Sequence, residues 1–225
     1  MSSSQKAPPA VPPPLTIAVP KGRILKPLGA LLARAGLETA PLFADDRTLI
    51  RQASPDLRFL LLKPDDVPTY VEYGAADLGV CGRDILDERG SDLYRPLDLG
   101  IGRCRMIVAG PIAALTAARE GASLPRVATK YPRTAAAHFA RRGVQAEVVY
   151  VQGSVELAPL TGLAELIVDL VETGATLVQN GLAEREEVGR VSSMLVANRA
   201  SFKLRQDVVG PLVQRLREAI DATAG

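Results

Sequence analysis

The spacing of apolar residues along the chain predicts strands that alternate with helices. Short apolar runs rich in Val, Ile and Leu are typical of buried strands, whereas apolar residues spaced three and four apart are typical of helices. Strands are predicted at 15–19, 57–62, 77–81, 126–129, 146–151 and 166–171. Helices are predicted at 24–36, at 69–73, from 82–84 onward, at 134–142 and over the segment holding Val208, Leu212, Leu216 and Ile220.

Alternation of this kind indicates an α/β fold with parallel sheets. The segment from about 105 to 185 holds a complete set of strands and helices, so it is expected to form a second sheet. We therefore expect a first lobe from 15–104 and 186–225, in which 192–200 is one further apolar run, and a second lobe from 105–185. Residues 1–14 are rich in Pro, Ser and Ala and are expected to be a disordered tail.

Composition narrows the class of protein. The 225 residues are 47% hydrophobic with a formal net charge of +2, and basic and acidic residues are interspersed, so we expect neither a nucleic-acid nor a membrane partner. No secretory leader and no membrane-spanning run is recognised, which favours the cytoplasm. Cys81 and Cys104 form no C-x-x-C pair and are expected to be small buried residues.

The stretch LIVDLVETGATL, residues 166–177, is the strongest candidate for chemistry. Asp169 stands in an apolar strand, where a buried carboxylate without partners is costly, so it is expected near the carboxyl end of the strand, facing a ligand. Gly174 allows a tight turn whose N–H groups and hydroxyls suit a phosphate. The spacing fits neither a dinucleotide fingerprint nor a P-loop. Residues Asp169, Glu172, Thr173, Gly174, Ala175 and Thr176 are therefore predicted to bind a sugar phosphate.

Charged residues follow other predicted strands, where α/β proteins bind ligands. Lys21, Gly22 and Arg23 place two cations at a helix start, which favours anions, although a solvated basic turn remains an alternative. The pair Arg83 and Asp84, together with Lys130, occupies equivalent positions, and Arg47 lies in a longer connection. Glu156 follows Ser154, and helix capping by Ser154 is the default explanation for this pair.

Four segments resemble the short form of ATP phosphoribosyltransferase. They are AVPKGRIL (18–25), KPDDVPTYVEYGAADLGVCGRDIL (63–86), RVATKYP (126–132) and GSVELAPLTGLAELIVDLVETGATLVQNGL (153–182). The resemblance implies an α/β, two-lobed fold similar to type II periplasmic binding proteins, with the site in a central cleft. It also implies that N1 of ATP attacks C1′ of phosphoribosyl pyrophosphate (PRPP), with Mg²⁺ on the diphosphate, in the first step of histidine biosynthesis.

The resemblance also implies roles for single residues. Asp169 would bind the ribose hydroxyls with Glu156 near the ribose, and residues 173–176 would bind the 5-phosphate. Lys21, Arg23 and Arg47 would meet the triphosphate and the departing pyrophosphate, Arg23 and Arg47 as catalytic residues. Pro20 stands where the family often has Ser. His138, the only histidine, is expected to be structural, and no metal-ligating side chain is predicted.

The short form implies partners as well. It works with a histidyl-tRNA-synthetase-like regulatory subunit in a hetero-octamer that contains catalytic-subunit dimers. In a sequence that ends at Gly225, the resemblance to the short form leads us to expect no regulatory domain. Two rival functions share parts of this pattern. A solute-binding or effector-binding module would need an export signal or a DNA-binding element, and a phosphoribosyltransferase for free bases would not need so many cations.

Overall fold

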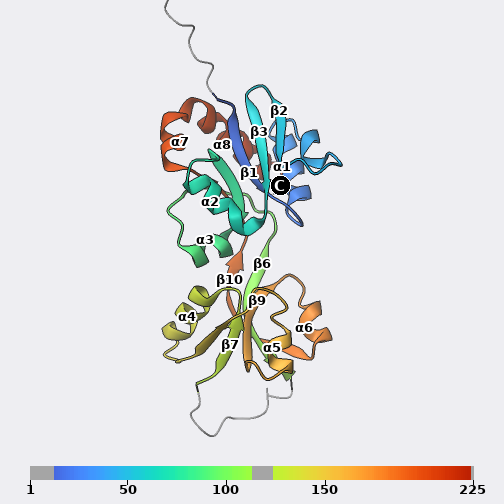
Figure 1. The fold of residues 1–225 in the computed structure, drawn as a ribbon, viewed down its shortest axis with the longest axis vertical. Helices are drawn as coiled ribbons and strands as arrows, with labels where there is room; N and C mark the ends of the chain where they lie inside the picture. Colours follow the sequence, from blue (N-terminus) through green and yellow to red (C-terminus); the bar gives the residue numbers. More distant parts are fainter. Residues whose placement is uncertain (1–12, 113–123, 224–225) are drawn as a thin grey trace, which may run out of the picture.

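The computed structural model describes residues 13–112 and 124–223 and contains two sheets, which lie one above the other in Figure 1. The first sheet has the order β2 (Ile50–Ser54), β3 (Leu57–Leu62), β1 (Leu15–Pro20), β4 (Leu78–Gly82), β11 (Ser193–Ala197) and β5 (Tyr94–Asp98). The second has the order β10 (Leu182–Val191), β6 (Cys104–Pro111), β9 (Leu166–Val171), β7 (Arg126–Thr129) and β8 (Glu147–Tyr150). We call each sheet with its helices the first and the second lobe.

Helices cover both sheets. The first lobe has α1 (Leu25–Arg34), α2 (Val67–Glu72), α3 (Arg83–Arg89), α7 (Arg199–Leu204) and α8 (Gln206–Asp221), with the 3₁₀ turns η1 (Ala40–Phe43) and η2 (Pro64–Asp66). The second lobe has α4 (Pro132–Arg141), α5 (Leu157–Leu160) and α6 (Ala175–Gln179). The predicted helices are present, with ends that differ by a few residues, while α6 and α7 were not predicted.

The sheets are mixed, so the expectation of parallel sheets is only partly right. β1 runs parallel to β3 and β4, and β7 runs parallel to β8 and β9. In contrast, β2, β11, β6 and β10 pair with their neighbours in antiparallel fashion. Of the strands absent from the predicted set, β2, β5 and β10 lie at sheet edges, whereas β6 lies inside the second sheet between β10 and β9.

The chain passes from the first lobe to the second between β5 and β6 and returns between β10 and β11 (Figure 1). Because β10 stays in the second sheet up to Val191, the return comes after Val191 and not at residue 185. Residues 1–12 of the expected tail lie outside the described residues. The carbonyl groups of Pro13 and Pro14 accept hydrogen bonds from Arg205, at 2.9 Å and 3.5 Å, so the end of that segment is docked.

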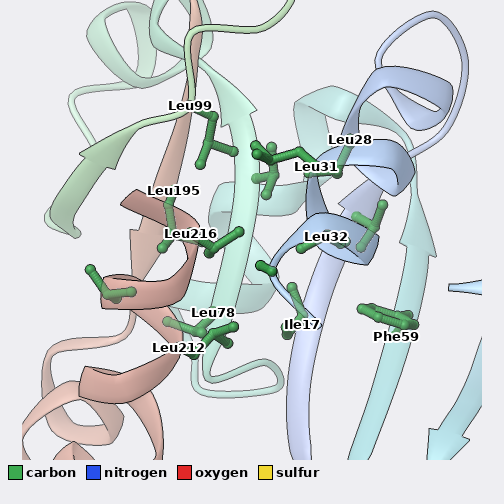
Figure 2. Packing of buried hydrophobic residues seen from close by; sticks show 14 of the residues in the cluster. Ile17, Leu28, Leu31, Leu32, Phe59, Leu78, Leu99, Leu195, Leu212 and Leu216 are labelled. Carbon is green, nitrogen blue, oxygen red and sulfur yellow. The ribbon is translucent and has the colours of Figure 1, made fainter. Parts of the chain in front are cut away.

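The largest apolar core lies where α1 and α8 cover one face of the first sheet (Figure 2). Leu28, Leu31 and Leu32 of α1 pack with Ile17 and Phe59 of the sheet, and Leu212 and Leu216 of α8 complete the cluster. The spacing of the α1 leucines puts them on one side of that helix, which explains their near-complete burial. A second core covers the other face of this sheet, around α2.

The second sheet is also covered on both faces. Ile107 and Ile167 pack with Ala158 of α5 and Leu177 of α6 on one face, and alternating residues pack against α4 on the other. Because side chains alternate along a strand, Asp169 lies on the same face as Ile167. This places Asp169 on the α5 and α6 side of the sheet. Within the described ranges, no helix has the length and apolar character needed to cross a membrane.

Candidate active site

A pocket of about 240 Å³ lies at the carboxyl end of β9. Many of the residues predicted for substrate binding line it, namely Arg23, Glu156, Asp169, Glu172, Thr173, Gly174, Ala175 and Thr176. Cys104, Leu170, Val171 and Leu177 complete its wall. Arg23 comes from the first lobe and the others from the second, so the pocket lies between the lobes. We call it the β9 pocket.

Asp169 is the only carboxylate within β9, and the structure directs it to the β9 pocket. Its Oδ1 accepts the N–H of Leu170 at 2.8 Å. Burial raises the pKa of Asp169, and the nearby Glu156 carboxylate adds to this, while the Leu170 N–H and Lys130 oppose it. A ligand that donates hydroxyl hydrogen bonds would stabilise the ionised form of this group.

The turn after β9 gives the pocket its second wall. Gly174 has a φ of +78°, a left-handed conformation that favours glycine, and it immediately precedes α6. No heavy atom lies within 4 Å of the position that a Cβ would take at Gly174. The N–H of Ala175 donates to Oγ1 of Thr173 at 3.4 Å, which tightens the turn. The first N–H groups of a helix favour anions, so this turn suits a phosphate.

Glu156 lines the β9 pocket, and its default explanation as part of a helix cap is wrong. Helix α5 begins at Leu157, and no side chain caps its first turn. Ser154 instead has a φ of +50°, and its backbone carbonyl accepts the N–H of Leu157 at 3.1 Å. The left-handed conformation is uncommon for a residue with a Cβ. The Glu156 carboxylate therefore faces the same space as Asp169.

Arg23 and Glu172 form an ion pair that connects the two lobes. Arg23 follows Gly22, whose φ of +93° allows the chain to turn between β1 and α1. Lys21 and Gly22 are exposed and do not line the β9 pocket, so only Arg23 of this predicted tripeptide lies in it. Both side chains of the ion pair are about half exposed, at 54% and 48%, so the pair contributes little to stability.

Arg47 does not lie beside the β9 pocket. It is exposed in the connection between η1 and β2 and lines none of the cavities described here. The neighbouring Asp46 binds the buried Arg51, with 2.6 Å between its Oδ1 and Nη1 of Arg51. The structure thus anchors this connection through Arg51 and leaves Arg47 at the surface.

Arg83 and Asp84 line a separate cavity of about 560 Å³ between α3, α4 and β10. Asp84 is buried and accepts a hydrogen bond from the Tyr131 hydroxyl at 2.9 Å. Burial raises the pKa of Asp84, and the Tyr131 hydroxyl opposes that rise. Arg83 contacts Asp87, with 3.3 Å between Nε and Oδ2. Neither residue lines the β9 pocket itself, but Arg83 also lines a neighbouring cavity that shares Cys104 and Glu172 with that pocket.

Lys130 binds Asp65 of η2, at 2.8 Å and 2.9 Å from its two carboxylate oxygens. Both residues line a cavity of about 410 Å³ between the lobes. Tyr131 and Asp65 were not predicted, because their contacts join segments that are far apart in the sequence. His138 is buried in α4, where it contacts Glu186, and it does not line the β9 pocket.

Cys104 is a further lining residue that sequence reasoning missed. Its burial agrees with the expectation, but its position at the start of β6 also brings it into the β9 pocket. Burial raises the pKa of the Cys104 thiol, the Asp84 charge adds to this, and Arg23 opposes it. No local sequence signal marks this residue, since its neighbours in the pocket come from other segments.

Among residues 13–112 and 124–223, no group of three or more His, Cys, Asp or Glu side chains is placed to hold a metal ion. Three carboxylates nevertheless line the β9 pocket, and because Glu172 pairs with Arg23, Glu156 and Asp169 are the two left for an ion. Mg²⁺ commonly binds one or two carboxylates together with substrate phosphates and water. The donor set of the β9 pocket fits a Mg²⁺ ion that arrives with a phosphorylated ligand.

Comparison with solved structures agrees with the two-lobed fold. The ATP phosphoribosyl transferase (HisG:HisZ) complex from Thermotoga maritima matches with a TM-score of 0.79 and 33% identity over 94% of this chain and 100% of that chain. The BvgS VFT2 domain of Bordetella pertussis, at 0.56 and 17% identity, covers 92% of each chain. The periplasmic aliphatic sulphonate binding protein SsuA of Escherichia coli, at 0.57 and 15%, covers 95% of this chain and 75% of its own. The last two show the fold alone, and the predicted periplasmic-binding-protein-like fold is confirmed.

Curated relatives cover almost the whole chain. The ATP phosphoribosyltransferase of Sorangium cellulosum (strain So ce56) is 64% identical over 213 residues, which are 94% of this chain and 97% of that protein. The ATP phosphoribosyltransferase of Halorhodospira halophila (strain DSM 244 / SL1) is 51% identical over 210 residues, 92% of this chain and 96% of the relative. The family model for HisG, ATP phosphoribosyltransferase, matches residues 63–218. The chain therefore belongs to the ATP phosphoribosyltransferase family.

Proposed function

We propose that this chain transfers the phosphoribosyl group of PRPP to N1 of ATP, the first step of histidine biosynthesis. The observation that carries the proposal is the β9 pocket. Three carboxylates and a glycine turn of the second lobe line it together with Arg23 of the first lobe, which pairs with Glu172. In the reaction, the N1–C1′ bond forms and the C1′–O bond to the diphosphate breaks. Pyrophosphate leaves with the electron pair of that bond.

Each wall of the β9 pocket suits one part of PRPP. Carboxylates accept hydrogen bonds from sugar hydroxyls, which favours Asp169 and Glu156 as the ribose partners. The turn over 173–176, which precedes α6, suits the 5-phosphate. Arg23 lines the same pocket, and its ion pair with Glu172 can exchange for a phosphate oxygen as PRPP binds.

The remaining predicted residues are proposed to serve ATP and the leaving group. Lys21 and Arg47 are exposed cations that suit the triphosphate and the departing pyrophosphate. Arg83, Asp84 and Lys130 lie at the lobe interface and are proposed to bind the nucleotide. Glu172 would hold Arg23 in place in the absence of substrate.

The chemistry requires charge stabilisation more than proton transfer. Displacement at C1′ builds positive charge on the ribose ring and negative charge on the leaving diphosphate. We assign stabilisation of the ring to Asp169 and Glu156 and stabilisation of the leaving group to Arg23, which is supported by their shared place in the β9 pocket. Orientation of the two substrates between the lobes supplies the rest of the rate enhancement. No residue is assigned as a general base.

Mg²⁺ is proposed to enter with PRPP. When bound, the ion would neutralise charge on the diphosphate, with Glu156 and Asp169 as the available carboxylates. The residues of the chain would bind and orient the substrate around it.

Partners and compartment are also proposals. The Thermotoga maritima structure is a HisG:HisZ complex, which supports a HisZ-like regulatory subunit, similar to histidyl-tRNA synthetase, for this chain. We propose a hetero-octamer that contains catalytic-subunit dimers and works in the cytoplasm. Histidine inhibition would then act through the regulatory subunit.

A direct assay tests the function. Purified protein is incubated with ATP, PRPP and Mg²⁺, with and without the regulatory subunit, and the products are identified by mass spectrometry. We expect phosphoribosyl-ATP and pyrophosphate in equal amounts. Replacement of ATP by free adenine tests the rival activity on free bases. Failure to form the adduct under either condition would refute the proposal, and binding of PRPP without turnover would support a binding module instead.

A further inference from the structure

Three acidic side chains of the first lobe contact one short segment of the second lobe. Asp65 binds Lys130, Asp84 accepts a hydrogen bond from Tyr131, and Glu88 contacts the first turn of α4. We call these three carboxylates, with residues 130–134, the interlobe seam. It forms one wall of the 410 Å³ cavity between the lobes, which Asp65, Glu88, Lys130 and Tyr131 all line.

Glu88 makes the largest number of hydrogen bonds in the interlobe seam. Its Oε1 accepts the N–H of Arg133 at 2.8 Å, and its Oε2 accepts the N–H and the hydroxyl of Thr134 at 2.9 Å and 2.8 Å. Helix α4 has no capping side chain at its own N-cap residue, Tyr131. The N–H groups of a helix start need acceptors, and a carboxylate there also meets the positive end of the helix dipole. A residue of the first lobe thus caps a helix of the second.

A second contact between the same two helices places a cation of the second lobe at the end of a helix of the first lobe. Helix α3 ends at Gly90, which has a φ of +65°, and the Arg133 guanidinium lies so close that an added Cβ at Gly90 would overlap it. The carbonyl end of a helix favours cations. The end of α3 and the start of α4 therefore complement each other in both directions, through Glu88 and through Arg133.

We propose that Glu88 is a positioning residue that holds the two lobes closed and fixes Lys130 at the cleft. Lys130 and Tyr131 directly precede α4, so a bond that fixes the first turn of α4 also fixes them. The role of Lys130 in this inference rests on the proposed function, whereas the closure of the lobes by Glu88 does not. Glu88 lies outside the β9 pocket and contacts no residue proposed to bind PRPP in it.

The expected effect of losing Glu88 follows from the fraction of molecules whose lobes are closed. A ligand that binds between closed lobes has an apparent affinity that scales with the closed fraction of the protein. Removal of three hydrogen bonds to a carboxylate is expected to lower that fraction about tenfold. The KM for PRPP should rise by about the same factor, while kcat stays near the wild-type value because saturating substrate closes the lobes again.

The test compares three variants of the full chain. Glu88→Ala removes the cap, and Thr134→Val removes only the hydroxyl contact and keeps the shape of the side chain. Glu72→Ala is the control, because Glu72 accepts the N–H of Asp92 within the first lobe, at 3.4 Å, and has the same charge. Small-angle X-ray scattering without ligand measures the lobe arrangement, and steady-state kinetics separate KM from kcat.

We expect a larger radius of gyration and a higher KM for Glu88→Ala, a smaller change of the same sign for Thr134→Val, and wild-type values for Glu72→Ala. A purely structural role would lower the melting temperature and the active fraction without raising KM. Wild-type scattering together with a wild-type KM in Glu88→Ala would overturn the inference. If no variant and no wild-type protein turns over PRPP, the proposed function fails, and the scattering result still decides whether Glu88 closes the lobes.

Discussion

Asp169 illustrates the conflict between function and stability at a single residue. Burial raises the pKa of its carboxyl group above the ordinary value of 3.8, so the folded state binds this proton more tightly than the unfolded chain does. The free energy of unfolding consequently falls as the pH rises through the range between the ordinary and the raised pKa. The ionised carboxylate is therefore less favourable for folding than the protonated one, and the proposed ribose contact is the compensating benefit.

The change Asp169→Asn is expected to stabilise the protein and to impair the reaction. The amide carries no charge to desolvate, so the melting temperature at pH 7 should exceed that of the wild type, and the difference should shrink as the pH is lowered. The loss of a charged hydrogen-bond partner should reduce kcat/KM for PRPP about 10- to 100-fold. Calorimetry at several pH values and steady-state kinetics measure both effects. A lower melting temperature for the variant at pH 7 would contradict the argument.

Arg23→Ala and Arg47→Ala are expected to lower kcat by about 100-fold, because each removes a cation proposed to stabilise the leaving pyrophosphate. Stability should change little, since both side chains are exposed and an exposed ion pair contributes about 1 kcal/mol or less. Arg34→Ala is the matched control, an exposed arginine in the last turn of α1. Turnover at the wild-type rate in either substitution would remove that residue from the catalytic set.

The residues of the site could be predicted only where their chemistry was local. Asp169 and the turn after it were predictable because an acid and small hydroxyl residues interrupt an apolar run. Tyr131 and Cys104 were not, since each acquires its role from a partner far away in the sequence, such as Asp84 for Tyr131. Arg47 was predicted from resemblance, and the described chain leaves it at the surface.

At the level of elements, edge position explains why β2, β5 and β10 were not predicted, although it does not explain β6, which lies inside the second sheet. β10 carries five charged residues and pairs with β6 alone, so it lacks the apolar run that marks a buried strand. β2 and β5 are the two edges of the first sheet and are likewise mostly polar or partly exposed. Central strands such as β1 and β4 are buried on both faces, which makes them recognisable from composition.

The turn between β9 and α6 gives an element-level prediction. Gly174→Ala places a Cβ on a left-handed residue at the β9 pocket, and we expect a loss of about 1–2 kcal/mol in stability and weaker PRPP binding. Gly162→Ala is the control, because Gly162 has a similar φ, +73° against +78°, equally open space and no place in the pocket. Chemical unfolding and titration calorimetry with PRPP measure the two effects. Equal PRPP affinities in the two variants would argue against a phosphate site at the turn.

At the scale of the whole molecule, the two cysteines differ in their position relative to the boundary between the lobes. Cys81 is buried in β4 inside the first lobe, and burial raises its pKa to about 12, so it remains a protonated thiol at pH 8. Cys104 lies where the chain enters the second lobe and lines the β9 pocket. We therefore expect opening of the lobes to expose Cys104 and to leave Cys81 covered.

Thiol labelling of the native protein at pH 8 should modify Cys104 before Cys81, and both slowly, because burial raises both pKa values. Addition of PRPP should slow the labelling of Cys104 by keeping the lobes closed, and leave Cys81 unchanged. Mass spectrometry of the labelled peptides identifies the site, and Cys104→Ser serves as the control. Faster labelling of Cys81, or no effect of PRPP, would contradict lobe opening as the route of access.

The order of strands in the first sheet has a consequence for protein synthesis. β11 lies between β4 and β5, yet it leaves the ribosome only after the whole second lobe has been made. At typical rates of synthesis, about 5–20 residues per second, the interval between Asp98 and Ser193 lasts on the order of ten seconds. During that time β4 has an open edge, and α8 is not yet available to cover the core. We therefore expect the first lobe to remain incompletely folded, with apolar surface that chaperones can bind, until the second lobe has been synthesised.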